Sequence, residues 1–229
     1  MHTESPCLIR LILVGFLAIM AVPASFAQET TADPAASDLT REMVLSPAAI
    51  DRRACKRPVI VEDIPYTWDQ LERGTEPAWL AYTNGDYAAS VPVFLRLAKV
   101  GHPIAQRLMG VVYYFGQGVP VDHRTSLVWF EKAANQGCFE AFAPTAQMYE
   151  RGEGTPADPG KAYAWYNIAV AHLPQGRERQ DMIERREAVA AALAPAQLEG
   201  AQKRSLQFVA RPVVPPDIAD LPEDFFTLP

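Results

Sequence analysis

Residues 105–137 read AQRLMGVVYYFGQGVPVDHRTSLVWFEKAANQG, and residues 141–172 read AFAPTAQMYERGEGTPADPGKAYAWYNIAVAH. The second stretch repeats the first without a gap, because the same residue recurs at seven positions with a constant spacing of 36. A fixed period in the mid-thirties is typical of arrays in which one helical unit stacks on the next. The recurring pairs are Ala105/Ala141, Tyr113/Tyr149, Gly116/Gly152, Gly118/Gly154, Asp122/Asp158, Trp129/Trp165 and Ala133/Ala169.

A weaker copy of the pattern lies upstream, where Asp86 and Gly101 stand 36 positions before Asp122 and Gly137. Its turn, Asn84-Gly85, is shorter than the loops of the later copies. The pattern therefore predicts an all-α fold, an α-solenoid of about three antiparallel helix pairs within residues 66–210.

The bounds of the expected helices come from local signals: aspartates cap helix starts, and glycines end helices. At Pro144 we expect a late start of the helix or a kink. The last two helices depart from the repeat pattern and are expected to cap the open end of the array. The expected helices are 76–83, 87–100, 103–115, 123–136, 139–151, 159–172, 177–193 and 196–209.

The recurring pattern A-x-x-x-(M/T)-(G/A)-x-x-Y-x-x-G-x-G, then D, then (A/S)-x-x-W-x-x-x-A-A-x-x-G resembles the Sel1-like repeat, a relative of the tetratricopeptide repeat. The resemblance covers roughly residues 76–172 and implies a module that binds other proteins. It departs from the family at Ala146, where Gly is usual. The residues that carry it are Ala105, Met109, Gly110, Tyr113, Gly116, Gly118, Asp122, Ser126, Trp129, Ala133, Ala134 and Gly137, then Ala141, Ala146, Tyr149, Gly152, Gly154, Asp158, Ala162, Trp165 and Ala169.

The recurring residues also admit chemical interpretations, which the sequence disfavours. The two Gly-x-Gly loops lack the preceding strand and the lysine that a phosphate-binding loop needs. Trp129 and Trp165 could form an aromatic ligand box, but their fixed phase favours core packing. Asp122 and Asp158 occupy equivalent positions in separate repeats, which favours helix caps over a catalytic carboxylate pair. We expect no catalytic residues.

No pair of histidines has the spacing of metal ligands on one helix, so we expect no metal and no cofactor. The net charge of −6 and a pI of about 5.3 disfavour nucleic acid as a partner.

In the tetratricopeptide-like arrays that this pattern resembles, the first helices of successive pairs line a concave groove, and the resemblance implies that the partner lies there. Groove positions should fall between the core positions of those helices, and an extended peptide held by side-chain hydrogen bonds would suit them. The alternative is an ordinary solvated groove with the interface elsewhere. The selected positions are Arg107, Val111, Tyr114, Ala143, Gln147 and Glu150.

Residues 1–27 have the layout of a secretory signal peptide, with an apolar run over 8–22 and Ser25-Phe26-Ala27 before the expected cleavage site. An uncleaved anchor is the alternative. After cleavage no stable membrane insertion is expected, and the mature chain would be exported, in the bacterial periplasm.

The flanks of the array are expected to be disordered. Residues 28–65 form a linker, in which 58–66 (PVIVEDIPY) should be extended rather than a paired strand. Residues 211–229 are a proline-rich acidic tail, expected to be flexible or to dock as a peptide, either on a partner or in the molecule's own groove.

Export leaves two cysteines, Cys55 and Cys138, and an even pair in an oxidising compartment suggests one disulfide. Two unpaired thiols are the alternative.

The expected function is a non-catalytic adaptor or regulator of the cell envelope that binds another envelope protein or peptide. A β-lactam-binding or hydrolysing enzyme related to cysteine-rich Sel1 proteins is one alternative, although this array contains only Cys138. A self-associating structural protein is another. The sequence does not determine the oligomeric state.

Overall fold

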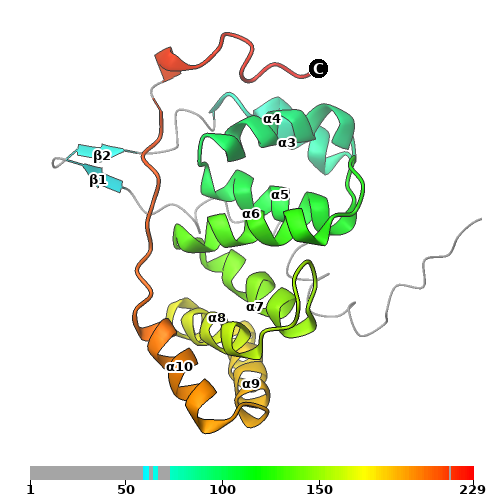
Figure 1. The fold of residues 1–229 in the computed structure, drawn as a ribbon. Coiled ribbons are helices and arrows are strands. Elements are labelled where there is room, and N and C mark those ends of the chain that lie inside the picture. Colours follow the sequence, from blue (N-terminus) through cyan, green and yellow to red (C-terminus); the bar gives the residue numbers. More distant parts are fainter. Residues whose placement is uncertain (1–58, 62–63, 67–72, 217) are drawn as a thin grey trace, which may run out of the picture.

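The computed structural model describes residues 59–61, 64–66, 73–216 and 218–229, and within this part of the chain helices dominate. Their bounds follow the sequence closely (Figure 1). The elements are β1 (Val59–Val61), β2 (Ile64–Tyr66), α3 (Glu76–Thr83), α4 (Tyr87–Lys99), α5 (Pro103–Phe115), α6 (His123–Asn135), the 3-10 turn η2 (Phe139–Ala141), α7 (Phe142–Arg151), α8 (Pro159–His172), α9 (Arg177–Ala191), α10 (Pro195–Leu206) and the 3-10 turn η3 (Ile218–Asp220).

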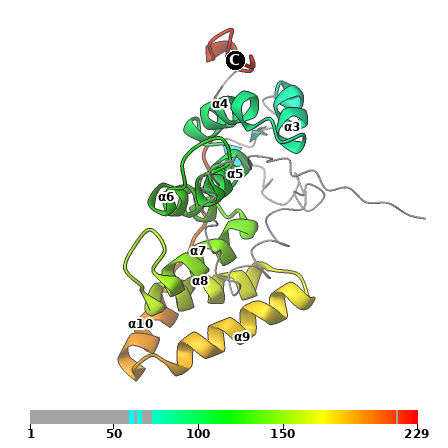
Figure 2. The ribbon, with the colours of Figure 1, turned by 90° about the vertical axis from the view of Figure 1, so that its right-hand side faces the viewer.

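The helices stack as consecutive antiparallel pairs, α3 with α4, α5 with α6 and α7 with α8, and the array closes on α9 and α10. Figure 2, turned by 90°, shows the same order from the α3–α4 end to α9. From α3 to α9 successive helices pack on one another, and α8 contacts α7, α9 and α10. The predicted α-solenoid is confirmed.

The second helix of each pair begins at the aspartate that the sequence marks as its cap. The side chains of Asp86, Asp122 and Asp158 each accept a hydrogen bond from the backbone N–H three residues on, at 3.1, 3.0 and 2.9 Å. Each bond satisfies an amide that the helix itself leaves unpaired. Pro144 has the expected effect, since α7 starts only at Phe142, after the short turn η2.

Small residues let the paired helices approach closely. A Cβ built on Gly110 of α5 would lie 2.6 Å from the ring of Phe130 on α6. Beside it, the hydroxyl of Ser126 donates to the carbonyl of Gly110 at 2.7 Å. The third pair has Ala146 at the position of Gly110, and that side chain is fully buried.

The two Gly-x-Gly loops dock each pair onto the pair before it. The second glycine of each loop has a positive φ, 73° at Gly118 and 75° at Gly154. It also abuts the first residue of the preceding second helix: Gly118 contacts Tyr87 of α4, and Gly154 contacts the backbone of His123 of α6. The 36-residue period therefore requires glycine here for space as well as for backbone conformation.

The segment 58–66 differs from expectation. β1 and β2 pair antiparallel, with Val59 opposite Tyr66 and Val61 opposite Ile64. The β-branched run finds its pairing partner in itself, so the expectation of an unpaired extended segment is corrected.

The C-terminal tail also differs, because it lies extended along one edge of the array instead of being disordered (Figure 1). Its backbone N–H groups at Arg211 and Val213 donate to the carbonyl of Asn135 and to the side chain of Gln136, at 2.8 and 3.0 Å. Further along, Phe225 is buried. Around Arg211 and Val213 the tail contacts the turns between pairs.

Several expectations fall outside the described residues: the signal peptide 1–27, the linker 28–58 and Cys55. Cys138 is buried and disulfide-bonded. The pairing with Cys55 stays a prediction. Within the part of the chain that the structure describes, no helix has the length and apolar character needed to span a bilayer.

We expect Gly154→Ala to destabilise the fold well beyond the matched change Gly85→Ala. Both glycines have a positive φ, which costs an alanine about 1–2 kcal/mol. Around Gly85 a Cβ meets nothing within 4 Å, whereas at Gly154 it meets the backbone of His123. Overpacking should add about 1–3 kcal/mol in urea unfolding. Equal losses in the two variants would show that the loop is not closely docked.

Candidate partner-binding site

The candidate site lies where α5 of the second pair meets α7 of the third. The hydroxyl of Tyr114, near the end of α5, donates to Glu153 in the next Gly-x-Gly loop at 3.0 Å. The ring of Tyr114 stacks on His123, with ring centroids 4.9 Å apart and an interplanar angle of 15°. A small pocket opens beside this contact. It is lined by Tyr114, Phe115, Phe130, Pro144, Gln147, Met148 and Glu153.

The same contact occurs one pair earlier. Tyr82 is the penultimate residue of α3, as Tyr114 is of α5. Its hydroxyl donates at 2.7 Å to Gln117, the middle residue of the Gly116-Gln117-Gly118 loop. The tyrosine near the end of α3 and the one near the end of α5 thus each bond to the middle of the next loop. We call these two contacts the loop latches.

Glu150, the penultimate residue of α7, makes the corresponding link at the closing end. Its carboxylate accepts the hydroxyl of Tyr166 on α8 at 2.5 Å, and Arg185 on α9 lies 3.8 Å away. Burial, together with the bond and charge of Glu150, raises the pKa of Tyr166 above its ordinary value. Glu150 therefore ties α7 to the capping helices.

The other predicted groove residues are buried, which corrects their expected exposure. Val111 and Ala143 are enclosed in the core. Arg107 is 3% exposed and forms an ion pair with Glu140 of η2 at 2.9 Å. Burial lowers the pKa of the Arg107 guanidinium, and the charge of Glu140 opposes that shift. Pro103 through Val112 of α5 are all buried, so no face of this stretch is left to line an open groove.

Gln147 is also buried, at 2% exposure, but its situation differs. Neither the amide oxygen nor the amide nitrogen has a hydrogen-bond partner. An unsatisfied buried amide is costly, on the order of 1–3 kcal/mol for each group, and is therefore uncommon. Gln147 lines the pocket beside Tyr114 and Phe115.

The electrostatics of the loop latches come from burial and from the groups that accept the hydroxyls. Burial and the neighbouring Tyr87 raise the pKa of Tyr82 to about 12. Burial and the carboxylate of Glu153 raise the pKa of Tyr114 to about 12. Both hydroxyls therefore stay protonated and donate at neutral pH.

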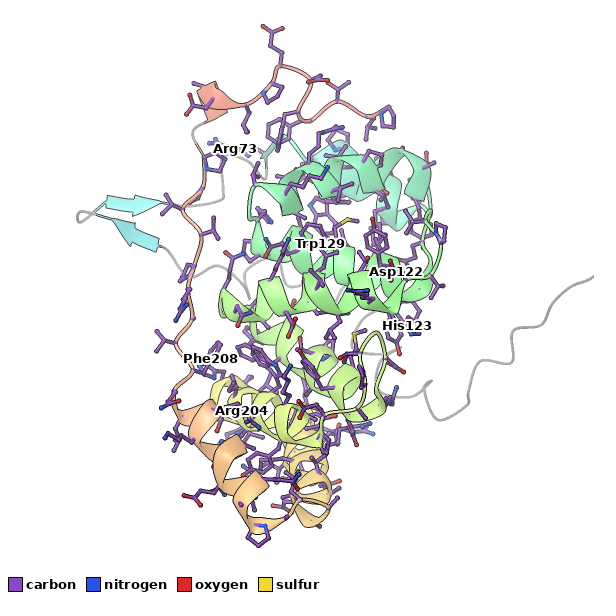
Figure 3. The ribbon with its side chains drawn as sticks, viewed as in Figure 1. Arg73, Asp122, His123, Trp129, Arg204 and Phe208 are labelled. Atoms are coloured by element: carbon purple, nitrogen blue, oxygen red, sulfur yellow. The ribbon has the colours of Figure 1, made fainter. Side chains whose placement is uncertain are left out.

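The recurring residues serve the scaffold in the structure. The small ones lie buried between helices, the first glycine of each loop ends its helix in the left-handed conformation, and the aspartates cap. Figure 3 places Asp122 and His123 together, away from Phe208. The positions are Ala105, Gly110, Tyr113, Gly116, Gly118, Asp122, Trp129, Ala133, Gly137, Ala141, Tyr149, Gly152, Gly154, Asp158, Trp165 and Ala169.

The histidines hold structural places. The ring of His102 accepts the backbone N–H of Ala105 at 3.1 Å, and His172 bonds to the carbonyl of Ile168 at 2.8 Å. Across the described ranges no group of three His, Cys, Asp or Glu side chains could hold a metal ion.

Sequence reasoning missed the middle residues of the loops, Gln117 and Glu153, and missed Tyr82. The loop residues differ in type, so they do not appear as a repeat. Tyr82 stands 32 positions before Tyr114 rather than 36, because the Asn84-Gly85 turn is short. Aligning the helix ends instead of the ungapped sequence would have revealed the match.

Comparison with known proteins agrees with this architecture. The model of the Sel1 repeat matches residues 103–138 and 145–172. The chain therefore carries Sel1 repeats over these residues. A solved structure, c5321, a protective antigen present in uropathogenic Escherichia coli strains displaying an SLR fold, is similar with a TM-score of 0.54. At 23% sequence identity, over 62% of this chain and 30% of that one, the likeness concerns the fold.

Two sequence relatives share the repeats. Chitin synthase regulatory factor 4 of Schizosaccharomyces pombe is 40% identical over 80 residues, which are 34% of this chain and 13% of that protein. An uncharacterised protein of Neisseria meningitidis serogroup B is 36% identical over 88 residues, which are 38% of this chain and 18% of that protein. The matched region thus spans less than a fifth of either relative.

We expect Tyr114→Phe to lower the free energy of unfolding by about 1–2 kcal/mol, because it removes a hydrogen bond to a carboxylate. Tyr113→Phe is the matched control, since the neighbouring hydroxyl has no bond within the described structure. Urea unfolding of Tyr114→Phe, of Glu153→Gln and of the double variant that combines them gives the coupling energy of the latch. Additive losses from the two changes would contradict a direct bond.

Stability should fall as the pH rises from about 10 to about 12. The folded pKa values of Tyr82 and Tyr114 lie above the unfolded value near 10, so their contribution is complete below pH 10 and is lost toward pH 12. In the Tyr82→Phe/Tyr114→Phe double variant the decline should be shallower. Thermal melting across this range measures it, and parallel curves for both proteins would exclude the latches as its cause.

Proposed function

We propose that this chain is a non-catalytic adaptor or regulator of the cell envelope, and that it binds an extended segment of a partner protein at the pocket between α5 and α7. Sel1 repeats commonly serve protein interaction or regulation, and a relative that shares the repeats carries the name of a regulatory factor. Both support a protein as the partner. The pocket between α5 and α7 is the proposed binding site for that partner.

Gln147 is the residue that supports the proposal of an extended partner segment in this pocket. A side-chain amide offers one donor and one acceptor, and so does each peptide unit of an extended chain. A partner's main chain that reaches Gln147 would satisfy both of its unpaired atoms at once. In the free protein these atoms are desolvated and unbonded, so much of the desolvation cost of binding is already met.

The pocket walls favour an apolar side chain next to that main-chain contact. Phe130, Pro144 and Met148 contribute apolar surface, while Phe115 is 37% exposed at the edge. Val121, at 58% exposure, follows the loop that begins after Phe115. An apolar pocket with one well-placed polar group is a common form of peptide recognition.

The proposed envelope location is supported by the signal-like residues 1–27 and by the disulfide at Cys138. Disulfides persist in oxidising compartments and are rare in the cytosol of mesophiles.

The test places a photo-crosslinking benzoylphenylalanine at position 115 in the full chain, expressed in its native cells, and analyses the periplasmic fraction. Position 206 is the matched control, because Leu206 is 83% exposed on α10, far along the array. We expect a discrete protein adduct at 115 and none at 206.

The captured protein, purified, is then titrated with wild type, Gln147→Leu and Leu206→Ala. Loss of two hydrogen bonds, about 1 kcal/mol each, should weaken binding by Gln147→Leu at least about tenfold, while Leu206→Ala binds as wild type. Equal affinities of all three proteins would rule out this pocket as the binding site.

A further inference from the structure

The end of the tail is held by α4 and by the residues just before α3, much as a bound peptide is held by a receptor. Arg96 of α4 donates from Nε to the carbonyl of Phe225 at 2.7 Å and from Nη2 to the carbonyl of Thr227 at 2.6 Å. One guanidinium thus donates hydrogen bonds to two main-chain carbonyls that are two residues apart. The contacts join residues 129 and 131 positions apart in sequence, so no local constraint brings them together.

Side chains at the same place provide selectivity. Phe225 is 5% exposed. The ring of Phe226 covers Gly74, where a Cβ would lie 2.6 Å from it, and the two phenyl rings meet edge to face at 5.0 Å. Leu228 packs against the core. Main-chain hydrogen bonds together with places for specific side chains are a common means of recognising a peptide.

The rest of the tail runs to this place over the turns between pairs. The amide of Gln136 accepts Val213 N–H at 3.0 Å and donates to the carbonyl of Gly101 at 2.7 Å. Val213 itself covers Gly101, and Ala210 covers the equivalent Gly137. The tail therefore reaches the α3–α4 end already oriented.

We propose that the α3–α4 end is a peptide-binding site, occupied in cis by the turn-forming residues 222–228 and taken in trans by a partner protein's segment of the same chemistry. That segment has two adjacent aromatic residues, an apolar residue two positions later and acidic residues before them, as in Glu223-Asp224-Phe225-Phe226-Thr227-Leu228. The site is separate from the α5–α7 pocket and does not depend on it.

The cis segment regulates the site by competition. A tethered ligand acts at an effective concentration on the order of millimolar, so a free segment of equal intrinsic affinity binds poorly until the tail is released. Because a partner must displace the tail, the site selects partners whose intrinsic affinity exceeds that of the tail segment.

The test uses a fluorescent peptide of residues 219–229 and the full chain carrying Phe225→Ala and Phe226→Ala, which leaves the tail present but weakens its docking. Fluorescence anisotropy should show at least tenfold tighter peptide binding to this variant than to wild type. Adding Arg96→Gln should reduce binding again. A peptide in which both phenylalanines are alanine should not bind.

The proposal fails if the folded variant, checked by circular dichroism, does not bind the peptide at up to about 1 mM, or binds no better than wild type. If the variant does not fold, hydrogen exchange of the wild-type protein tests the proposal instead. Excess peptide should accelerate hydrogen exchange at Phe225 and Thr227, whose N–H groups bond to Pro222 and Asp224 carbonyls at 3.0 Å. Unchanged exchange would overturn the proposal. Dimers of wild type in light scattering, dissociated by the peptide, would assign the site to a second copy instead.

Discussion

The structure depends on how closely each Gly-x-Gly loop docks against the helix pair before it. A helix pair of this size buries too little surface to be stable alone, so each pair must gain its stability from its neighbours. Gly118 and Gly154 allow the contact because a side chain in their place would overlap Tyr87 or the backbone of His123. The residue between the glycines then accepts a hydroxyl from the preceding pair, at Gln117 and at Glu153. In each of these two loops, the backbone conformation of glycine and a side-chain hydrogen bond together hold the loop against the preceding helix pair.

The close docking of the loops leaves few polar side chains of the first helices available to a partner. In the second and third pairs the polar residues of the first helices are largely committed to inter-pair bonds, as Arg107 is with Glu140 and Glu150 is with Arg185. Gln147 is the exception, since its amide is buried and unpaired. At the opposite edge the tail holds α3–α4 through Arg96. One proposed binding site therefore contains a polar side chain that the scaffold leaves unpaired. The other is already occupied by a segment of the same chain.

The helices could be predicted because their signals are local. An aspartate cap, a glycine stop and a proline act within one turn, and Asp122 and Pro144 had the expected effects. Exposure could not be predicted in this way, because whether Arg107 or Val111 faces solvent depends on what packs across the helix from elsewhere. The tail has no hydrophobic period, and Arg96 lies 129 residues from its partner Phe225. The latches were missed because their acceptors vary and Tyr82 is displaced by a shorter turn.

Cooperativity between the pairs is the most direct consequence of the docked loops. Native-state hydrogen exchange in increasing denaturant gives an opening free energy for the amides of α4, α6 and α8 separately. If the loops couple the pairs, the slowest amides of all three helices should converge on one opening free energy, that of global unfolding. Opening of α3–α4 at a free energy several kcal/mol lower, with α8 still protected, would contradict the account.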